Sequence, residues 1–157
     1  MQKISTGLWF DDNAEEAVHF YLSVFKNGKI TATSYYGPEG PGPEGSVLTI
    51  QFEIEGREFE AINGGPHFSF TPAISLIVNC ETQEEVDWYW EKLSEGGSKD
   101  MCGWLTDKFG LSWQIVPTEL GRLMQAEDRE KVSRMMKAML RMHKLDIQAL
   151  KLAFEGK

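Results

Sequence analysis

The sequence CGWLTDKFGLSWQIVP, residues 102–117, carries the clearest structural pattern of the chain. Asp107-Lys108-Phe109-Gly110 has the composition of a turn, and the residues on both sides are rich in aromatic and β-branched side chains. Such residues favour strands, whereas Asp and Gly interrupt them. The stretch therefore predicts a strand over residues 98–105 and a second over residues 111–116.

Upstream of this stretch, the sequence predicts a strand followed by a helix. Residues 73–78 (AISLIV) form a short apolar run, and Thr82 stands three positions before Glu85. That spacing is typical of a capping box, in which each side chain bonds a free backbone N–H at the start of a helix. The helix ends at Gly96-Gly97, and its expected buried face consists of Val86, Trp90 and Leu93.

The first half of the chain repeats this order of elements. Residues 4–10 predict a strand, and apolar residues at helical spacing from Ala14 to Phe25 predict a helix. We expect Asn13 and the aspartates before it to cap that helix, and Asn27-Gly28 to end it.

Three further strands are expected before residue 63. Residues 29–36 are rich in β-branched and aromatic side chains, and residues 46–54 alternate polar and apolar positions. Glu55-Gly56 then predicts a tight turn into a strand over residues 57–62.

Residues 37–45 (GPEGPGPEG) interrupt these strands. Proline lacks the backbone donor that a ladder needs, and glycine weakens a strand, so the segment is expected to be a loop. Two roles are open for it, a plain solvated connection or a lid at the mouth of a pocket.

After Pro117 the pattern is helical. Thr118 is a candidate N-cap, residues 128–142 predict a long helix, and Asp146 is expected to cap a last short one. We expect the methionine-rich stripe of the long helix to pack on the outer face of the sheet, or else to form a dimer contact. The predicted domains are residues 1–117, with modules of about 1–66 and 67–117, and a helical extension, residues 118–157.

Composition excludes several classes of function. A formal charge of −8 over 157 residues disfavours nucleic acid and anionic lipid as partners. No apolar run approaches the roughly 20 residues of a membrane span. The first residues lack a signal-peptide core, so a cytoplasmic protein is expected, in which both cysteines stay thiols.

Four stretches resemble one known family. They are residues 8–17 (LWFDDNAEEA) with Phe20-Tyr21, residues 63–68 (NGGPHF), residues 77–82 (IVNCET) and residues 102–117. Together they are similar to the PhnB-like branch of the glyoxalase/bleomycin resistance, or vicinal-oxygen-chelate, superfamily, often labelled 3-demethylubiquinone-9 3-methyltransferase. The resemblance covers roughly residues 4–117.

This resemblance implies an α+β fold with paired βαβββ modules that form a U-shaped mixed sheet, usually in a homodimer. In many relatives a divalent metal in the hollow is held by His or Glu on the first and last strands of each module. The corresponding positions here fall near Thr6, at Glu60, among residues 73–75 and at Gln114. Only Glu60 is a strong ligand, and divalent metals need several. We therefore predict no bound metal and no other cofactor.

The candidate site residues come from the same positions. Glu60, His67, Trp104 and Gln114 are predicted to bind a ligand. His67 could act as a general base with Glu60, because imidazole titrates near neutral pH, or it could be an ordinary loop residue. Cys102 could be a nucleophile if a cation lowered its pKa, or a structural thiol.

Three functions remain open at this point. The favoured one is a small-molecule-binding protein without a metal. The second is an enzyme of the same fold, an isomerase, lyase or dioxygenase that uses a metal or an acid–base pair. The third is the methyltransferase of the family label, but the glycine-rich segments 37–45 and 63–66 do not open helices, as a site for a methyl donor usually requires.

Overall fold

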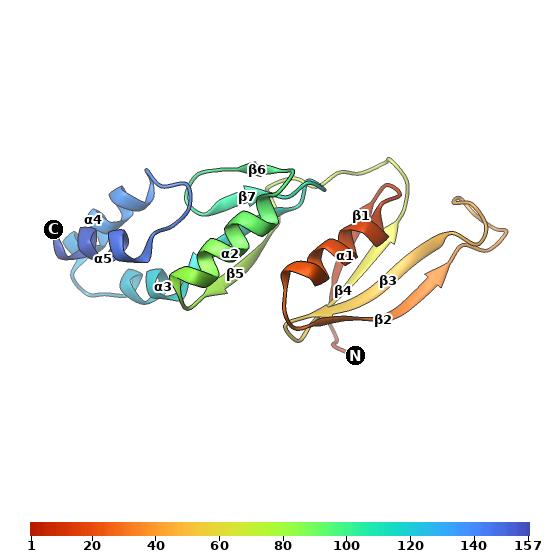
Figure 1. The fold of residues 1–157 in the computed structure, drawn as a ribbon, viewed down its shortest axis with the longest axis horizontal. Helices are drawn as coiled ribbons and strands as arrows, with labels where there is room; N and C mark the ends of the chain where they lie inside the picture. Colours follow the sequence, from red (N-terminus) through yellow and green to blue (C-terminus); the bar gives the residue numbers. More distant parts are fainter. The chain divides into compact units, whose positions relative to one another are not determined.

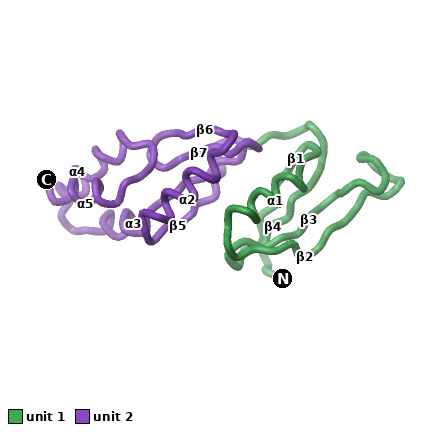
Figure 2. The backbone as a smooth tube through the Cα atoms, in the orientation of Figure 1, with its two compact units in different colours: residues 1–70 green, residues 71–157 purple.

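The computed structural model describes all residues from 1 to 157. They divide into two compact units, residues 1–70 and residues 71–157 (Figures 1 and 2). No helix combines the length and the apolar character needed to cross a lipid bilayer.

The first unit contains the first module, a βαβββ arrangement. Its sheet has the strand order β1-β4-β3-β2, with β1 parallel to β4 and the other neighbours antiparallel. The elements are β1 (Thr6–Phe10), α1 (Ala14–Val24), β2 (Gly28–Tyr35), β3 (Val47–Ile54) and β4 (Arg57–Asn63). The predicted turn at Glu55-Gly56 is confirmed, since both residues have positive φ between two strands in register.

The second unit contains the second module, with the same topology. Its strand order is β5-β8-β7-β6, and β5 runs parallel to β8. The elements are β5 (Ser75–Cys80), α2 (Gln83–Ser94), β6 (Ser98–Lys99), β7 (Trp104–Thr106) and β8 (Ser112–Pro117). The two modules confirm the predicted α+β class of paired βαβββ units.

Each helix covers one face of its own sheet (Figure 1). Alternation along β3 and β4 buries one row of side chains beneath α1, and the other row stays half-buried. The buried row of the first module comprises Leu8, Phe10, Ile50, Phe52, Ile54, Phe59 and Ala61. In the second module, Val86, Trp90 and Leu93 of α2 are buried as predicted, with Leu105, Trp113 and Ile115 of the sheet.

The ends of α1 differ from the prediction. Asn13 makes no side-chain cap, and the backbone N–H of Ala14 instead donates to Oδ1 of Asn63, 2.8 Å away. The helix ends at Val24, with Phe25 extended, so Asn27-Gly28 does not end it. Gly28 begins β2, where a Cβ would lie 2.9 Å from the Glu53 carbonyl oxygen. Close strand contact, not helix termination, requires that glycine.

The predicted strand over residues 98–105 is wrong, because a turn divides it into β6 and β7. Cys102 and Gly103 have φ of 59° and 81°, outside the strand region. Their backbone N–H groups donate to the carbonyl oxygens of Met142 and His143, both at 2.8 Å. Carbonyl groups about 40 positions away along the chain thus accept the hydrogen bonds that a neighbouring strand would accept in a continuous β-strand.

The extension, residues 118–157, forms α3 (Thr118–Met124), α4 (Arg129–Met139) and α5 (Ile147–Glu155) within the second unit. The prediction that Asp146 caps the last helix is confirmed, since its carboxylate accepts from the Ala149 N–H. Thr118 is not a cap, because it is already the first helical residue and Pro117 precedes it.

The methionine stripe of α4 packs mainly inside the extension. The buried core of the extension comprises Leu120, Leu123, Val132, Met135, Leu145, Leu150 and Phe154, and Met136, Met139 and Met142 pack against it. Because α4 packs against α5 rather than against the sheet, the expected packing on the outer face of the sheet is wrong. The alternative role of the stripe, a dimer contact, stays a prediction.

Candidate functional site

The sheet face opposite α1 is the open face of the first module, and Glu60 lies on it. Phe59 and Ala61, its neighbours in β4, are buried under α1, so alternation directs the Glu60 carboxylate to the other side. Thr6 shares its row with the buried Leu8, so the ligand position expected near Thr6 is not at Thr6 itself. The residue in register with Glu60 on β1 is Gly7.

The open face of the first module does not fit a divalent metal. A Cβ at Gly7 would meet no atom within 4 Å, so there is space beside Glu60 but no donor. Glu53 and Glu58 share this face, but no three such side chains come together in a possible metal site. One carboxylate at the expected ligand positions is too few for a catalytic metal.

The open face of the second module brings together two of the predicted ligand-binding residues. Trp104 of β7 and Gln114 of β8 are direct cross-strand partners. Nε2 of Gln114 also donates to Oγ of Ser75 at 2.9 Å. Residues 73–75 and Gln114 were the two metal positions expected in this module, and they form a neutral amide–hydroxyl pair.

This pair likewise does not fit a metal, because amide and hydroxyl oxygens are weak ligands without a carboxylate or imidazole beside them. Nowhere does the structure gather three or more His, Cys, Asp or Glu side chains into a possible metal site. The chemistry that these faces offer is hydrogen bonding and aromatic contact.

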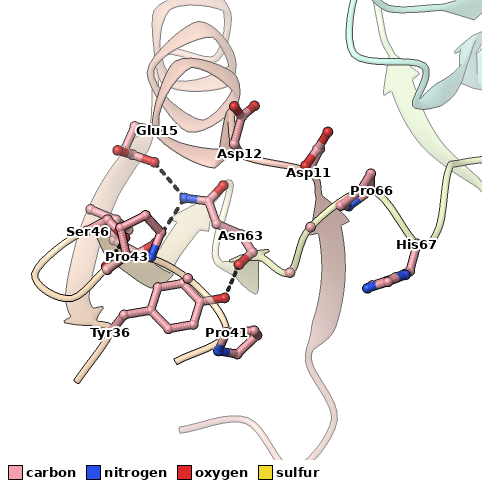
Figure 3. A pocket seen from close by; sticks show the side chains of 14 residues that line it. Asp11, Asp12, Glu15, Tyr36, Pro41, Pro43, Ser46, Asn63, Pro66 and His67 are labelled. Atoms are coloured by element: carbon pink, nitrogen blue, oxygen red, sulfur yellow. Dashed lines mark hydrogen bonds between the residues drawn. The ribbon is translucent and has the colours of Figure 1, made fainter. Parts of the chain in front are cut away.

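A cavity of about 470 Å³ lies at one end of the first module (Figure 3). It is bounded by the β1–α1 connection, the first turn of α1, the β2–β3 loop and the segment after β4. Its lining consists of Asp11, Asp12, Glu15, Tyr36, Pro41, Gly42, Pro43, Ser46, Val47, Asn63, Gly64, Gly65, Pro66 and His67. The volume is in the range of small-ligand sites.

Asn63, the last residue of β4, organises this cavity. Its buried side chain accepts from the Ala14 N–H and donates to the Glu15 carboxylate at 2.8 Å and to the Val47 carbonyl at 3.1 Å. These three bonds connect β4, α1 and β3. A buried amide with its donors and acceptor satisfied holds its surroundings in one arrangement.

The β2–β3 loop is tied to the same residue. The Tyr36 hydroxyl donates to the Asn63 carbonyl, and the Tyr36 N–H donates to the Ser46 carbonyl at 2.8 Å. Gly42 lies against the Tyr36 ring, where a Cβ would be 2.3 Å from the nearest ring atom. The loop predicted over residues 37–45 therefore borders a cavity, as a lid would have to do. That the loop moves as a lid stays a prediction.

His67 lines the cavity and is exposed, and its imidazole has no hydrogen-bond or ion-pair partner. Glu60 is not part of the lining. The two residues proposed as an acid–base pair thus do not meet in this cavity. A general-acid–base role requires both groups within reach of one substrate.

The two thiols differ in their surroundings. Cys80 is buried at the end of β5, and burial, with the Glu85 carboxylate nearby, raises the pKa of its thiol to about 12. A thiol that keeps its proton packs as a small apolar side chain and is unreactive. Cys102 is half-buried, and its Sγ donates to the Met139 carbonyl at 3.6 Å. No lysine or arginine forms an ion pair with it, so nothing supports a nucleophile there.

Of the predicted site residues, only His67 lines the cavity, and the roles of Asn63 and Tyr36 were not predicted. Asn63 stood only within the segments 63–66 and 63–68, and Tyr36 only within the strand predicted over residues 29–36. The signal that could have found the site is the pairing of two turn-forming segments, residues 11–13 and 63–66, at the carboxyl ends of strands that lie side by side.

A family model described as 3-demethylubiquinone-9 3-methyltransferase matches residues 2–116. The chain belongs to this family. The match ends just before α3, so the extension lies outside the segment that defines the family. No protein of curated function is similar enough to count as a match.

Solved structures agree with this assignment. A PhnB protein of Bacillus cereus is 43% identical, with a TM-score of 0.68 over 74% of this chain and 99% of that one. The fosfomycin resistance protein FosX of Listeria monocytogenes, solved with Mn(II) and sulfate, is 18% identical, with a TM-score of 0.51 over 73% of this chain and 92% of that one. A Bacillus cereus protein described as a possible glyoxalase is 16% identical, with a TM-score of 0.50 over 74% and 98%. The last two show a shared glyoxalase-like fold.

Proposed function

We propose that this PhnB-like protein binds a small organic molecule on the open face of a sheet, without a resident metal. The observation that carries the proposal is the cluster of Trp104, Gln114 and Ser75, which combines an aromatic surface with directed hydrogen bonds. Glu60 and Trp9 supply the corresponding groups in the first module. Apolar surface with a few placed polar groups is the usual composition of a ligand site.

Native mass spectrometry of protein purified from its own host tests this proposal. We expect a bound molecule in the wild type, and its loss in Trp104→Ala and in Gln114→Ala, which removes the amide. Gln125→Ala changes an exposed amide in the extension and should keep the molecule. Wild-type protein that carries no molecule, or equal occupancy in all four proteins, would contradict the proposal.

The absence of a metal has its own test. Because only one carboxylate lies at the expected positions, elemental analysis should find less than about one zinc, nickel, manganese or iron per chain. A stoichiometric metal that disappears in Glu60→Gln would instead support the metal-dependent enzyme of the same fold.

The family description favours a methyltransferase as a second candidate. Two glycine-rich segments are available for a methyl donor, and neither precedes a helix. Residues 37–45 join two antiparallel strands, and residues 63–66 lead into irregular chain. We therefore expect no heat of binding when S-adenosylmethionine is titrated into the protein; a saturable isotherm would favour the methyltransferase.

We further propose that the protein acts as a homodimer in the cytoplasm, with no nucleic-acid or membrane partner. The formal charge of −8, which repels phosphate backbones and anionic lipids, supports the expected lack of nucleic-acid and membrane partners. Light scattering at micromolar concentration should give about twice the chain mass of 17.8 kDa. A monomer would contradict the dimer and leave ligand binding to be judged by its own experiment.

A further inference from the structure

The open faces of the two modules differ in charge. In the first module, strand register places Glu53 opposite Glu58, and Lys29 of β2 pairs with Glu53 at 3.8 Å. Glu60 lies on the same face. In the second module, the rows of side chains that register places on the open face contain no charged residue. The two faces therefore suit ligands of different chemistry.

Hydroxyl groups form one row of the open face of the second module. The row follows residues that are in register from β5 across β8 and β7 to β6, and it comprises Ser75, Ser112, Thr106 and Ser98. A hydroxyl group donates and accepts hydrogen bonds without carrying a charge. This part of the face can bond a neutral polar group but offers no counter-ion.

The next row places an amide between two apolar side chains. Ile77 of β5, Gln114 of β8 and Trp104 of β7 are in register, and Ile77 is 56% exposed. Neighbouring strands lie about 4.8 Å apart, so the row spans about 10 Å, enough for a molecule of two fused rings. In the last row, Val116 packs against the core of the extension, which bounds the face at that end.

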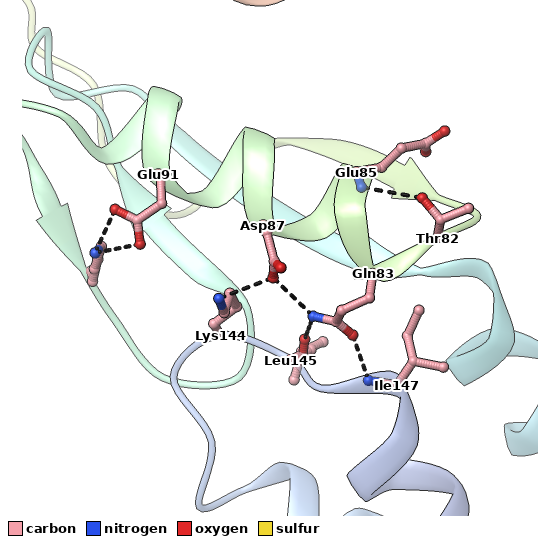
Figure 4. Close-up of polar contacts among 9 residues, drawn as sticks. Thr82, Gln83, Glu85, Asp87, Glu91, Lys144, Leu145 and Ile147 are labelled. Carbon is pink, nitrogen blue, oxygen red and sulfur yellow. Dashed lines mark hydrogen bonds and ion pairs between the residues drawn. The ribbon is translucent and has the colours of Figure 1, made fainter.

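The charged side chains around this sheet lie on its helix side. Lys99 of β6 is in register with Leu105, which is buried beneath α2, and Nζ of Lys99 lies 2.9 Å from the Glu91 carboxylate. Nζ of Lys144 lies 2.9 Å from the Asp87 carboxylate of the same helix (Figure 4). Both lysines are thus paired with α2 and do not serve a ligand on the opposite face.

The Gln114 amide is fixed in place but keeps bonding capacity. Its Nε2 donates to the Ser75 hydroxyl at 2.9 Å, which restrains the plane of the amide. The second N–H and the amide oxygen have no partner within the chain. A ligand that matches both carries a hydrogen-bond acceptor and a donor side by side on one edge.

We propose that the open face of the second module binds an uncharged planar molecule of two fused rings, with a donor beside an acceptor on one edge, as in a lactam. This inference rests on the proposed function and names the class of ligand. The rings lie against Trp104 and Ile77, and the polar edge meets the Gln114 amide. A carboxylate, phosphate or ammonium group would lose water at this row without gaining a partner of opposite charge.

The probe is 2-quinolinone, a lactam of two fused rings, titrated into ¹⁵N-labelled full-length protein. We expect shifts in the side-chain amide signals of Gln114 and the indole N–H signal of Trp104, and no shift in the indole signal of Trp9 in the first module. No shift at millimolar 2-quinolinone, or shifts confined to the first module, would overturn the proposal.

Three related molecules test the ligand class. 1-Methyl-2-quinolinone lacks the donor and should bind about tenfold more weakly, since one hydrogen bond is lost. 2-Naphthoate and 2-naphthylmethylammonium keep two fused rings but carry a charge, and each should bind at least about tenfold more weakly than 2-quinolinone. Equal or tighter binding of either ion would overturn the uncharged class.

A matched pair of variants tests the role of Gln114. Gln114→Glu keeps the size of the side chain and adds a negative charge, so 2-quinolinone should bind about tenfold more weakly and 2-naphthylmethylammonium about tenfold more tightly. Gln125→Glu makes the same change in net charge on the exposed surface of the extension and should change either affinity less than about twofold. Equal changes in both variants would overturn the site. Unchanged amide dispersion shows that both variants still fold.

The molecule that purifies with the protein from its host separates this inference from the proposed function. A charged molecule that is lost in Trp104→Ala would support small-molecule binding and overturn the uncharged class. Protein that carries no molecule but binds 2-quinolinone at Gln114 and Trp104 would contradict the proposed function and support the ligand class. Protein that neither carries a molecule nor binds 2-quinolinone would contradict both.

Discussion

The first and second modules have the same strand order and the same helix position, yet they support their outer hairpins differently. In the first, β2 and β3 are eight residues each and pair along most of their length. In the second, β6 has two residues and β7 three, and the extension binds the loop between them. The comparison teaches that the helix and the inner strands define this topology, while the hairpin can be stabilised by its own ladder or by a distant segment.

The largest expected effect concerns a carboxylate that only the second module has. Buried Asp107 accepts from the Phe109 and Leu111 N–H groups and, at 2.9 Å, from Nε1 of Trp113. Asp107→Ala leaves these buried donors without their acceptor, so we expect the free energy of unfolding to fall by about 3–5 kcal/mol. Urea denaturation measures it.

The control for this prediction is Asp107→Asn. The amide oxygen can still accept from both backbone N–H groups, whereas the bond from the Trp113 indole is lost. We expect roughly half of the alanine effect. A cost below about 1 kcal/mol for both variants would mean that the hairpin does not depend on this carboxylate.

Asn63 has the corresponding central role in the first module. Asn63→Ala removes three side-chain hydrogen bonds, including the cap of α1, and should lower the free energy of unfolding by about 2–3 kcal/mol. Glu15→Gln keeps an oxygen for the Asn63 amide and should cost less than about 0.5 kcal/mol. A similar cost for both would show that the Glu15 charge, and not the amide network, stabilises this end of the module.

Two glycines allow a direct comparison of the modules. Gly103 has φ of 81°, and a Cβ there would lie 2.7 Å from the Ile115 carbonyl oxygen, whereas a Cβ at Gly7 would meet nothing within 4 Å. Gly103→Ala should therefore cost about 2 kcal/mol, and Gly7→Ala should be neutral or stabilising by about 0.5 kcal/mol. Thermal unfolding of the two variants checks the pair, and a destabilised Gly7→Ala would show that the space beside Glu60 is needed.

Gln83 tests how the extension is attached. Gln83→Ala removes both of its bonds to residues 145 and 147, and we expect a loss of about 1 kcal/mol together with faster hydrogen exchange across residues 142–147. Gln148→Ala, an exposed amide on α5, should change neither quantity. Unchanged exchange in Gln83→Ala would mean that the loop contacts at Cys102 and Gly103 hold the segment by themselves.

The last effect is the smallest at neutral pH, where it vanishes, and appears only at alkaline pH. Burial raises the pKa of Cys80 from 9.0 to about 12, so the folded thiol keeps its proton where the unfolded one ionises. Stability is therefore unaffected at neutral pH and falls as the pH rises through 9 toward 12, by about 1.4 kcal/mol at pH 10. Cys80→Ala should remove that part of the pH dependence, and Cys102→Ala should keep it. Thiol titration of native protein should detect Cys102 and not Cys80.

Local signals predicted much of the fold. Thr82 caps α2 by accepting from the Glu85 N–H, and Asp146 caps α5, because a cap needs only a side chain within three residues of its donor. The alternation in β3 and the turn at Glu55-Gly56 were predictable for the same reason. One detail differs: the Glu85 carboxylate accepts from the Glu81 N–H and not from that of Thr82.

The failures share a different cause. The N-terminal donor of α1 is satisfied by Asn63, 49 positions away, and the strand over residues 98–105 is divided by carbonyl groups of the extension. Neither partner can be identified from neighbouring residues. The ligand position expected near Thr6 falls at Gly7, because one position of register moves a side chain to the opposite sheet face.

For the candidate site, the sequence by itself determined the chemistry: the family, the shortage of imidazole and carboxylate at the metal positions, and the residue types available to a ligand. Only the tertiary structure decided the grouping. It made Trp104, Gln114 and Ser75 neighbours, separated Glu60 from the cavity that His67 lines, and placed residues 142–147 beside α2. The physical reason is that residue types fix which bonds a side chain can form, whereas strand pairing and packing fix which partners come within bonding distance.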